Sequence, residues 1–153
     1  MCHRTRDYGA RRRRKIGGTE LGALIRLHLA AHFFIDDWRV EFSGPIINLA
    51  SEYASPLGLI FNELTTNAMK YGALSLPNGT AKITWSVEKI DQTPSKLLIT
   101  WQERGGPKIA SKVNVSFGTS IIEKGLPEAV VKNTFAEEGL TCTIELVLNR
   151  PNG

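Results

Sequence analysis

The chain has few cysteines, few aromatic residues and no long apolar run. Its 153 residues include two cysteines, Cys2 and Cys142, and 8% aromatic side chains. So few cysteines exclude a disulfide framework and favour a reducing, cytoplasmic compartment. The absence of any run of about 18 apolar residues excludes a membrane-spanning helix. The first residues are charged, with no apolar stretch behind them, which argues against a secretory signal peptide.

The composition is otherwise ordinary, apart from a basic segment at the start. With 42% hydrophobic and 22% charged residues, a chain of this length predicts one globular domain. Residues 1–15 hold seven of the 19 basic residues and one of the 15 acidic residues. The run Arg11–Arg14 suits either nucleic-acid binding or a self-repelling, disordered tail. We favour the tail, and therefore expect residues 1–18 to be irregular, residues 19–153 to form the domain, and nucleic acid not to be a partner.

The predicted elements pass from helices early in the chain to strands later. In chain order we expect a helix over 20–34 capped by Thr19, strands over 38–42 and 46–49 joined as a hairpin, a helix over 56–71, strands over 81–87 and 96–103, a short helix over 118–124, and a closing hairpin of strands over 129–135 and 140–148. This order predicts an α+β two-layer sandwich, with helices packed on one face of a sheet rich in antiparallel pairs.

The segment 56–71 is the most informative part of the chain. Ser55 suits the N-cap position, Pro56 the first helical position, and Gly72 the position after the C-cap. An apolar stripe runs along the predicted helix, formed by Leu57, Ile60, Phe61, Leu64, Ala68 and Tyr71. We therefore expect one side of this helix to be buried and another to be free to line a site.

Three polar side chains project from one face of this helix. Glu63 and Asn67 are four residues apart, and Lys70 follows three residues later. An amide oxygen can ligate a hard cation, an ammonium group can meet phosphate charge, and a carboxylate can take a proton or orient water. The alternative is an ordinary solvated face. Asn67 argues against that alternative, because asparagine is a poor residue for a helix interior.

Two later segments also suit a nucleotide. Glu103 ends a predicted strand, on the core side, and the glycines that follow, such as Gly105, allow close approach of a planar ligand. A carboxylate there can accept a hydrogen bond from an exocyclic amine, or it can simply precede an ordinary turn. Gly118 and Thr119 open a short predicted helix that presents backbone amides to phosphate, or only a capped turn.

The segments FNELTTNAMKYGAL, WQERGGP and SFGTSII occur in this order and together resemble the ATP-binding half of HWE-type sensor histidine kinases. The resemblance extends from about Thr19 to the C-terminus and includes FSGPIINL before the second helix. It implies the Bergerat ATPase fold, a two-layer α/β sandwich with a mixed, largely antiparallel sheet. It also implies ATP and Mg²⁺ as cofactors, and a phosphoacceptor histidine domain and a response regulator as partners.

The resemblance assigns roles to residues of the second helix. Asn67 would ligate Mg²⁺. Glu63 would stand where the superfamily has a general base or a polar residue of the metal site. Lys70 and Tyr71 would flank the phosphates and the lid that covers them. The catalytic residues implied are therefore Glu63 and Lys70.

Further roles fall on the later segments. Glu103 would replace the aspartate that usually recognises the adenine amine, and Gly105 would shape that pocket. Gly118 and Thr119 would contact phosphate. Ser116 departs from the family pattern, because a glycine is usual at this position.

The phosphoacceptor module of the family is a second departure, because no histidine of this chain has the sequence context of the acceptor. We therefore expect the chain to be a catalytic domain that transfers the γ-phosphoryl group of ATP to a histidine on a separate domain or chain. The alternative is an inert nucleotide-binding or protein-interaction module. A nucleic-acid binder acting through Arg11–Arg14 is a weaker third hypothesis.

Overall fold

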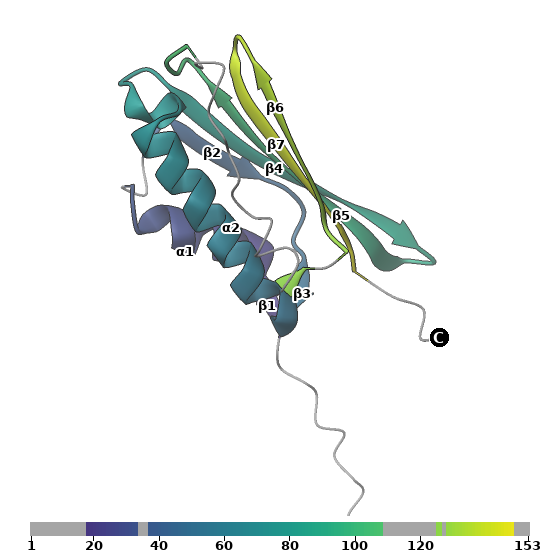
Figure 1. Cartoon of the computed structure of the whole chain (residues 1–153). Helices are drawn as coiled ribbons and strands as arrows, with labels where there is room; N and C mark the ends of the chain where they lie inside the picture. Colours follow the sequence, from purple (N-terminus) through teal and green to yellow (C-terminus); the bar gives the residue numbers. More distant parts are fainter. Residues whose placement is uncertain (1–17, 34–36, 109–124, 127, 149–153) are drawn as a thin grey trace, which may run out of the picture.

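The computed structural model, which describes residues 18–33, 37–108, 125–126 and 128–148, has two layers (Figure 1). The helix layer holds α1 (Leu21–Ala30), α2 (Ser51–Lys70) and a 3-10 turn, η1 (Ala73–Ser75). In the described part of the chain the main sheet has five strands: β2 (Val40–Ser43), β4 (Thr80–Ile90), β5 (Thr93–Arg104), β6 (Val130–Ala136) and β7 (Gly139–Val147). Two short strands, β1 (Gly18–Glu20) and β3 (Asn48–Ala50), form a separate pair.

The order of the main sheet is β2-β4-β5-β7-β6. The strand β2 is parallel to β4, and the other three pairings are antiparallel. The sheet is therefore mixed and largely antiparallel, and both helices lie on the same side of it (Figure 1). The predicted α+β two-layer sandwich is confirmed, as are the predicted strand pairs β4–β5 and β6–β7. Among the described residues, no helix is long and apolar enough to cross a membrane.

The core lies between the helices and the inner face of the sheet. Side chains alternate along each strand, so one face collects the apolar residues. Ile83, Trp101 and Cys142 are register neighbours on β4, β5 and β7 and are almost completely buried. They meet the apolar stripe of α2, represented by Phe61 and Leu64, which are also fully buried. Burial of this stripe is the main reason that α2 forms where it does.

The helix α2 begins earlier than the sequence predicts. Ser51 is its first residue, and Ala50 is the N-cap without a side-chain hydrogen bond. The prediction that Ser55 caps the helix and Pro56 opens it is wrong. Because β3 leads directly into the helix, Pro56 lies inside it, although a proline there cannot donate the usual hydrogen bond. Gly72 does follow the C-cap residue Tyr71, as predicted.

The expected hairpin of strands 38–42 and 46–49 is also wrong. The strand β2 pairs with β4, and β3 pairs with β1. The indole of Trp85 explains why the chain leaves the main sheet here. Its Nε1 donates to the carbonyl oxygen of Pro45 at 2.7 Å, and a Cβ added to Gly44 would lie 2.3 Å from the same ring. Gly44 therefore allows the chain to cross the indole and turn away from β2.

The helix α1 starts at the predicted place but with a different cap. The carboxylate of Glu20 accepts hydrogen bonds from the backbone N–H groups of Gly22 (2.9 Å) and Ala23 (2.7 Å). Thr19, the predicted cap, lies in β1 instead. The helix ends at Ala30, short of the predicted residue 34. The predicted helix over 118–124 and the basic residues of 1–17 lie outside the described residues.

Candidate nucleotide and metal site

The polar face predicted for α2 is present, with its three side chains at different depths. Glu63 and Lys70 are exposed, and Asn67 is half-buried. The flank of α2 that holds Gly58 and Asn62 faces α1, so Glu63, Asn67 and Lys70 lie on another side of the helix. Within the described residues, no hydrogen bond or ion pair occupies these three side chains. They are therefore free to meet a ligand.

The C-terminal end of α2 lies next to the end of β5, where Glu103 is located. The N–H of Gly72 donates to the carbonyl oxygens of Asn67 (3.0 Å) and Ala68 (3.1 Å). Gly72 has a φ of −100°, so it is not needed for a left-handed turn. Its small size is what matters, because an added Cβ would lie 2.3 Å from Oε2 of Glu103. The glycine lets the carboxyl group come up against the end of the helix.

Glu103 is 3% exposed, and both of its carboxyl oxygens accept hydrogen bonds from the protein. Its Oε2 accepts from the backbone N–H of Ala73 at 3.0 Å, and its Oε1 accepts from Nε1 of Trp101 at 2.9 Å. A buried carboxyl group needs such partners, because burial without them is costly. Each oxygen still has a second lone-pair direction that can accept a further hydrogen bond.

Glycines bring the loop after β5 against η1. Gly105 has a φ of +73°, which favours glycine, and an added Cβ would lie 3.3 Å from the carbonyl oxygen of Asn78. A Cβ added to Gly106 would lie 2.7 Å from Cα of Ala73. The predicted residues Glu103 and Gly105 therefore lie beside the end of the helix that carries Glu63, Asn67 and Lys70. Gly118, Thr119 and Ser116 lie outside the described residues.

Tyr71, the C-cap residue of α2, is 68% exposed, so the prediction that it continues the buried apolar stripe is wrong. On the sheet, Cys142 is a free, fully buried cysteine next to Trp101 in the register. Burial, followed by the charge of Glu103, raises the pKa of the Cys142 thiol to about 12. The thiol is therefore neutral and adds no charge to the surroundings of the carboxyl group.

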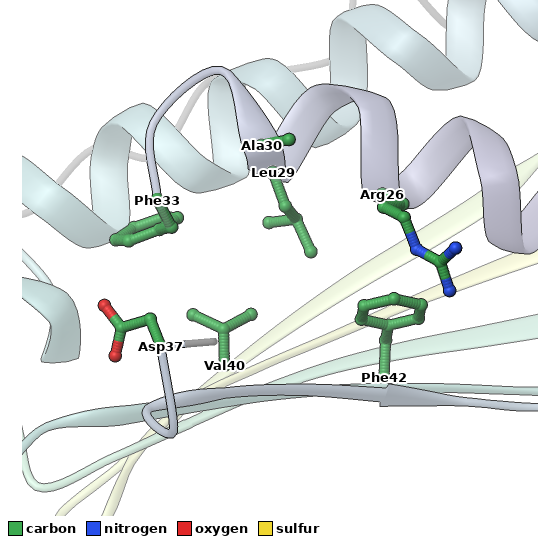
Figure 2. Close-up of a pocket in the computed structure, with 7 residues that line it drawn as sticks. All are labelled: Arg26, Leu29, Ala30, Phe33, Asp37, Val40 and Phe42. Carbon is green, nitrogen blue, oxygen red and sulfur yellow. The ribbon is translucent and has the colours of Figure 1, made fainter. Parts of the chain in front are cut away.

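The close-up in Figure 2 shows a pocket at a different place, between α1 and β2. Its volume is about 400 Å³, and it is lined by Arg26, Leu29, Ala30, Phe33, Asp37, Val40 and Phe42. The guanidinium of Arg26 lies over the ring of Phe42, 5.5 Å from its centroid, and Asp37 pairs with Arg39 at 2.8 Å. Of the predicted site residues that the structure describes, none lines this pocket. They lie on or next to α2 and the end of β5 instead.

Two features of the site were not predicted. The indole bond to Glu103 could have been suspected, since Trp101 and Glu103 are two residues apart on one face of a strand. The bond from the backbone of Ala73 could not, because no side-chain pattern records it.

Within the described residues, no group of three or more His, Cys, Asp or Glu side chains gathers to hold a metal ion.

Comparisons with solved structures show which fold this is. The histidine kinase domain of the Erythrobacter litoralis EL346 blue-light-activated histidine kinase matches with a TM-score of 0.66 and 21% identity, covering 84% of this chain and 61% of that chain. The nucleotide-free catalytic domain of the histidine kinase ThkA matches with a TM-score of 0.58 and 18% identity, covering 87% and 97%. The fold is therefore that of a histidine kinase catalytic domain.

A relative found by sequence has a higher identity to this chain than these two solved structures have. Blue-light-activated histidine kinase 1 of Erythrobacter litoralis (strain HTCC2594) is 37% identical over 118 residues, covering 74% of this chain and 31% of that protein. No protein-family model matches the chain. The chain belongs to the histidine kinase family, as its motifs indicate. It spans about a third of the length of this relative.

Proposed function

We propose that the chain is the ATP- and Mg²⁺-binding catalytic domain of a two-component sensor histidine kinase. It transfers the γ-phosphoryl group of ATP to a histidine on a separate domain or chain. The observation that carries the proposal is the junction of α2 with β5, where the buried carboxyl group of Glu103 lies against Gly72 and Ala73. A purine-recognising acid and a free polar helix face meet there.

The adenine end of the site is assigned to Glu103 and Gly105. The remaining lone pairs of the carboxylate accept a hydrogen bond from the 6-amino group of the base. Gly105 is assigned to shaping the adenine pocket by its motif. A hydrogen bond to a charged group contributes about 1.5–3 kcal/mol net. Adenine nucleotides should therefore bind about 10- to 150-fold more tightly than nucleotides without the amine.

The phosphate end is assigned to the exposed face of α2. Asn67 and Glu63 supply oxygen ligands for Mg²⁺, and two ligands fit this ion because it keeps several waters and binds the phosphates directly. When bound, the ion neutralises the charge of the transferred phosphoryl group. Lys70 and Tyr71 extend from the end of the same helix, where the phosphates pass. Gly118 and Thr119 are assigned to phosphate contact by their motif.

The chain's own residues therefore act mainly by holding the nucleotide in one orientation. Phosphoryl transfer needs alignment and charge stabilisation more than covalent help from the protein. We assign Glu63 to holding the metal or accepting a proton, a role that suits an exposed carboxylate with no hydrogen bond or ion pair within the described residues. The partners that follow from the family are a phosphoacceptor histidine domain and a response regulator. A cytoplasmic location fits the free Cys142 thiol.

The test is binding of a non-hydrolysable ATP analogue with and without Mg²⁺. Binding is measured as the rise in Tm on thermal unfolding. At about 100 times the dissociation constant, the ligand should stabilise the fold by about 2.7 kcal/mol. For a chain of this size that is a rise in Tm of about 5–11 °C. The variant Asn67→Ala should lose the part of this rise that depends on Mg²⁺.

The matched control is Asn62→Ala, on the flank of the same helix that faces α1 and 3.3 Å from His32. It should keep the dependence on Mg²⁺. If both variants lost the Mg²⁺-dependent rise in Tm equally, the polar residues of the helix would matter for folding and not for binding the metal. No rise in Tm with any nucleotide would overturn the proposed function.

A further inference from the structure

The carboxyl group of Glu103 is held from two directions by groups that are themselves fixed. One donor is the indole N–H of Trp101, at 2.9 Å from Oε1. The other is the backbone N–H of Ala73, at 3.0 Å from Oε2. Trp101 is 1% exposed and lies between Ile83 and Cys142 in the register, so its ring cannot swing away. The plane of the carboxyl group is therefore set before any ligand arrives.

A fixed plane decides which hydrogen bonds remain available. Each carboxylate oxygen has two lone-pair directions, and one on each oxygen is already used. The remaining directions cannot rotate to suit a different partner while both donors are in place. A carboxylate only accepts hydrogen bonds, so it attracts an amine on a purine ring and repels a ring carbonyl oxygen at the same position. Fixing the carboxylate therefore sharpens the distinction between the two groups.

We propose that Trp101 is a positioning residue that fixes the Glu103 carboxylate through its indole N–H and thereby specifies a base with a 6-amino group. The inference rests on the proposed function, because it concerns the nucleotide bound at the same site. Ala73, the first residue of η1, restrains the other oxygen, so removal of the indole donor leaves the carboxylate held at one side only. The side chain can then tilt and accept from water instead of from the base.

The experiment compares purine nucleotides that differ at position 6. ATP carries an amine there, purine riboside triphosphate carries hydrogen, and inosine triphosphate carries a carbonyl oxygen together with a hydrogen on N1. Dissociation constants are measured by calorimetry for the full chain and for Trp101→Phe, which keeps an aromatic ring and loses the N–H. We expect the preference for ATP over purine riboside triphosphate to fall by about 3- to 10-fold, the effect of one hydrogen bond. The affinity for purine riboside triphosphate should not change.

The control is Trp85→Phe. Trp85 is a second buried tryptophan on the same face of the sheet, and its N–H donates to Pro45 rather than to Glu103. This variant loses a hydrogen bond of the same kind and should keep the full preference for ATP. If Trp101→Phe does not fold, replacement of the Trp101 indole by a 3-benzothienyl ring removes the N–H with almost no change of shape.

The outcomes separate the inference from the proposed function. The positioning role is supported if the preference for ATP over purine riboside triphosphate falls in Trp101→Phe and is unchanged in Trp85→Phe. The positioning role is overturned if the Trp101 variants weaken the binding of ATP and of purine riboside triphosphate equally, or if they weaken the binding of neither. The proposed nucleotide site would still stand in that case. If the unaltered chain binds ATP but does not distinguish it from the analogue, Glu103 does not recognise the amine and the inference fails. If it binds no nucleotide, the proposed function fails as well.

Discussion

At the scale of single residues, Gly72 shows how one missing side chain permits a buried contact. Its Cβ, if present, would lie 2.3 Å from Oε2 of Glu103 and 2.9 Å from Cα of Ala68. The helix backbone cannot yield, so the carboxyl group would have to move and the N–H of Ala73 would lose its acceptor.

We therefore expect Gly72→Ala to destabilise the fold by about 1–3 kcal/mol, the cost of an unsatisfied buried donor. Urea unfolding measures the change. In a Glu103→Ala background the same substitution should cost less, because the nearer of the two groups that the new methyl would meet is gone. If the losses of unfolding free energy from Gly72→Ala and Glu103→Ala were additive, the contact between Gly72 and Glu103 would not be the cause.

His28 is a second residue whose environment has a measurable effect. Its imidazole packs against Gly58 of α2, where a Cβ would lie 2.4 Å from Nε2. Burial, followed by the charge of His32, lowers the pKa of His28 below its ordinary value of 6.5. The unfolded chain therefore binds a proton at a higher pH than the folded chain does. Stability should fall as the pH drops through 6.5.

Thermal unfolding at a series of pH values tests this. In His28→Asn the decrease in Tm below neutral pH should be smaller than in the unaltered chain, because the half-buried imidazole that titrates is gone. His32→Asn is the control. It removes only the lesser cause of the shift and should keep most of the decrease. The same pH dependence in the unaltered chain and in His28→Asn would rule out His28 as its source.

At the scale of elements, the sequence predicts what periodicity and turn residues determine. The strand pairs β4–β5 and β6–β7 follow from alternating apolar residues and short turns. One of these turns holds Asp91 and Gln92 at φ values of 48° and 64°. The pairing of β2 does not follow in this way. It depends on Trp85, which lies 40 residues beyond Pro45 in the sequence and contacts it only in the fold.

Helix ends were predicted less well than helix cores. Serine followed by proline favours a helix start, yet β3 makes α2 begin at Ser51. For α1, the cap is the carboxylate of Glu20 rather than the hydroxyl of Thr19, because Thr19 pairs with Leu49 in the small sheet. The preference for short polar caps is a tendency that tertiary pairing overrides.

The Glu20 cap leads to a prediction for the stability of α1. Its two hydrogen bonds, at 2.9 and 2.7 Å, satisfy N–H groups that otherwise have no partner in the helix. Glu20→Ala should lower the free energy of unfolding by about 0.5–2 kcal/mol, as measured for other caps. Glu52→Ala is the control, because Glu52 lies in the first turn of α2 without capping it. Equal effects of the two substitutions would attribute the result to charge rather than to capping.

At the scale of the whole molecule, the sequence predicted which segments meet but not how they are joined. Glu103 and Gly105 do lie at the end of the helix with Glu63, Asn67 and Lys70. The joining contacts come from the backbone of Ala73 and the ring of Trp101. The first has no sequence pattern, and the second needs the strand direction to be known. The motifs therefore predicted residues that lie close together in the fold, and their role in nucleotide binding stays a prediction. The contacts that hold Glu103 could be seen only in the structure.

The chain spans about a third of the length of its relative, so its activity has to be measured with an added acceptor. We expect ATP labelled at the γ-position, Mg²⁺ and a separate acceptor domain from a histidine kinase to give label on that domain. The label should be lost in acid, as expected for a phosphoramidate bond. Asn67→Ala should abolish the transfer, because the metal and the phosphates lose their ligand on α2. The double variant His28→Asn and His32→Asn should keep it, since these histidines pack between the two helices rather than on the proposed site. Label found on the chain's own histidines, or none on the acceptor domain despite tight ATP binding, would contradict transfer to a separate domain.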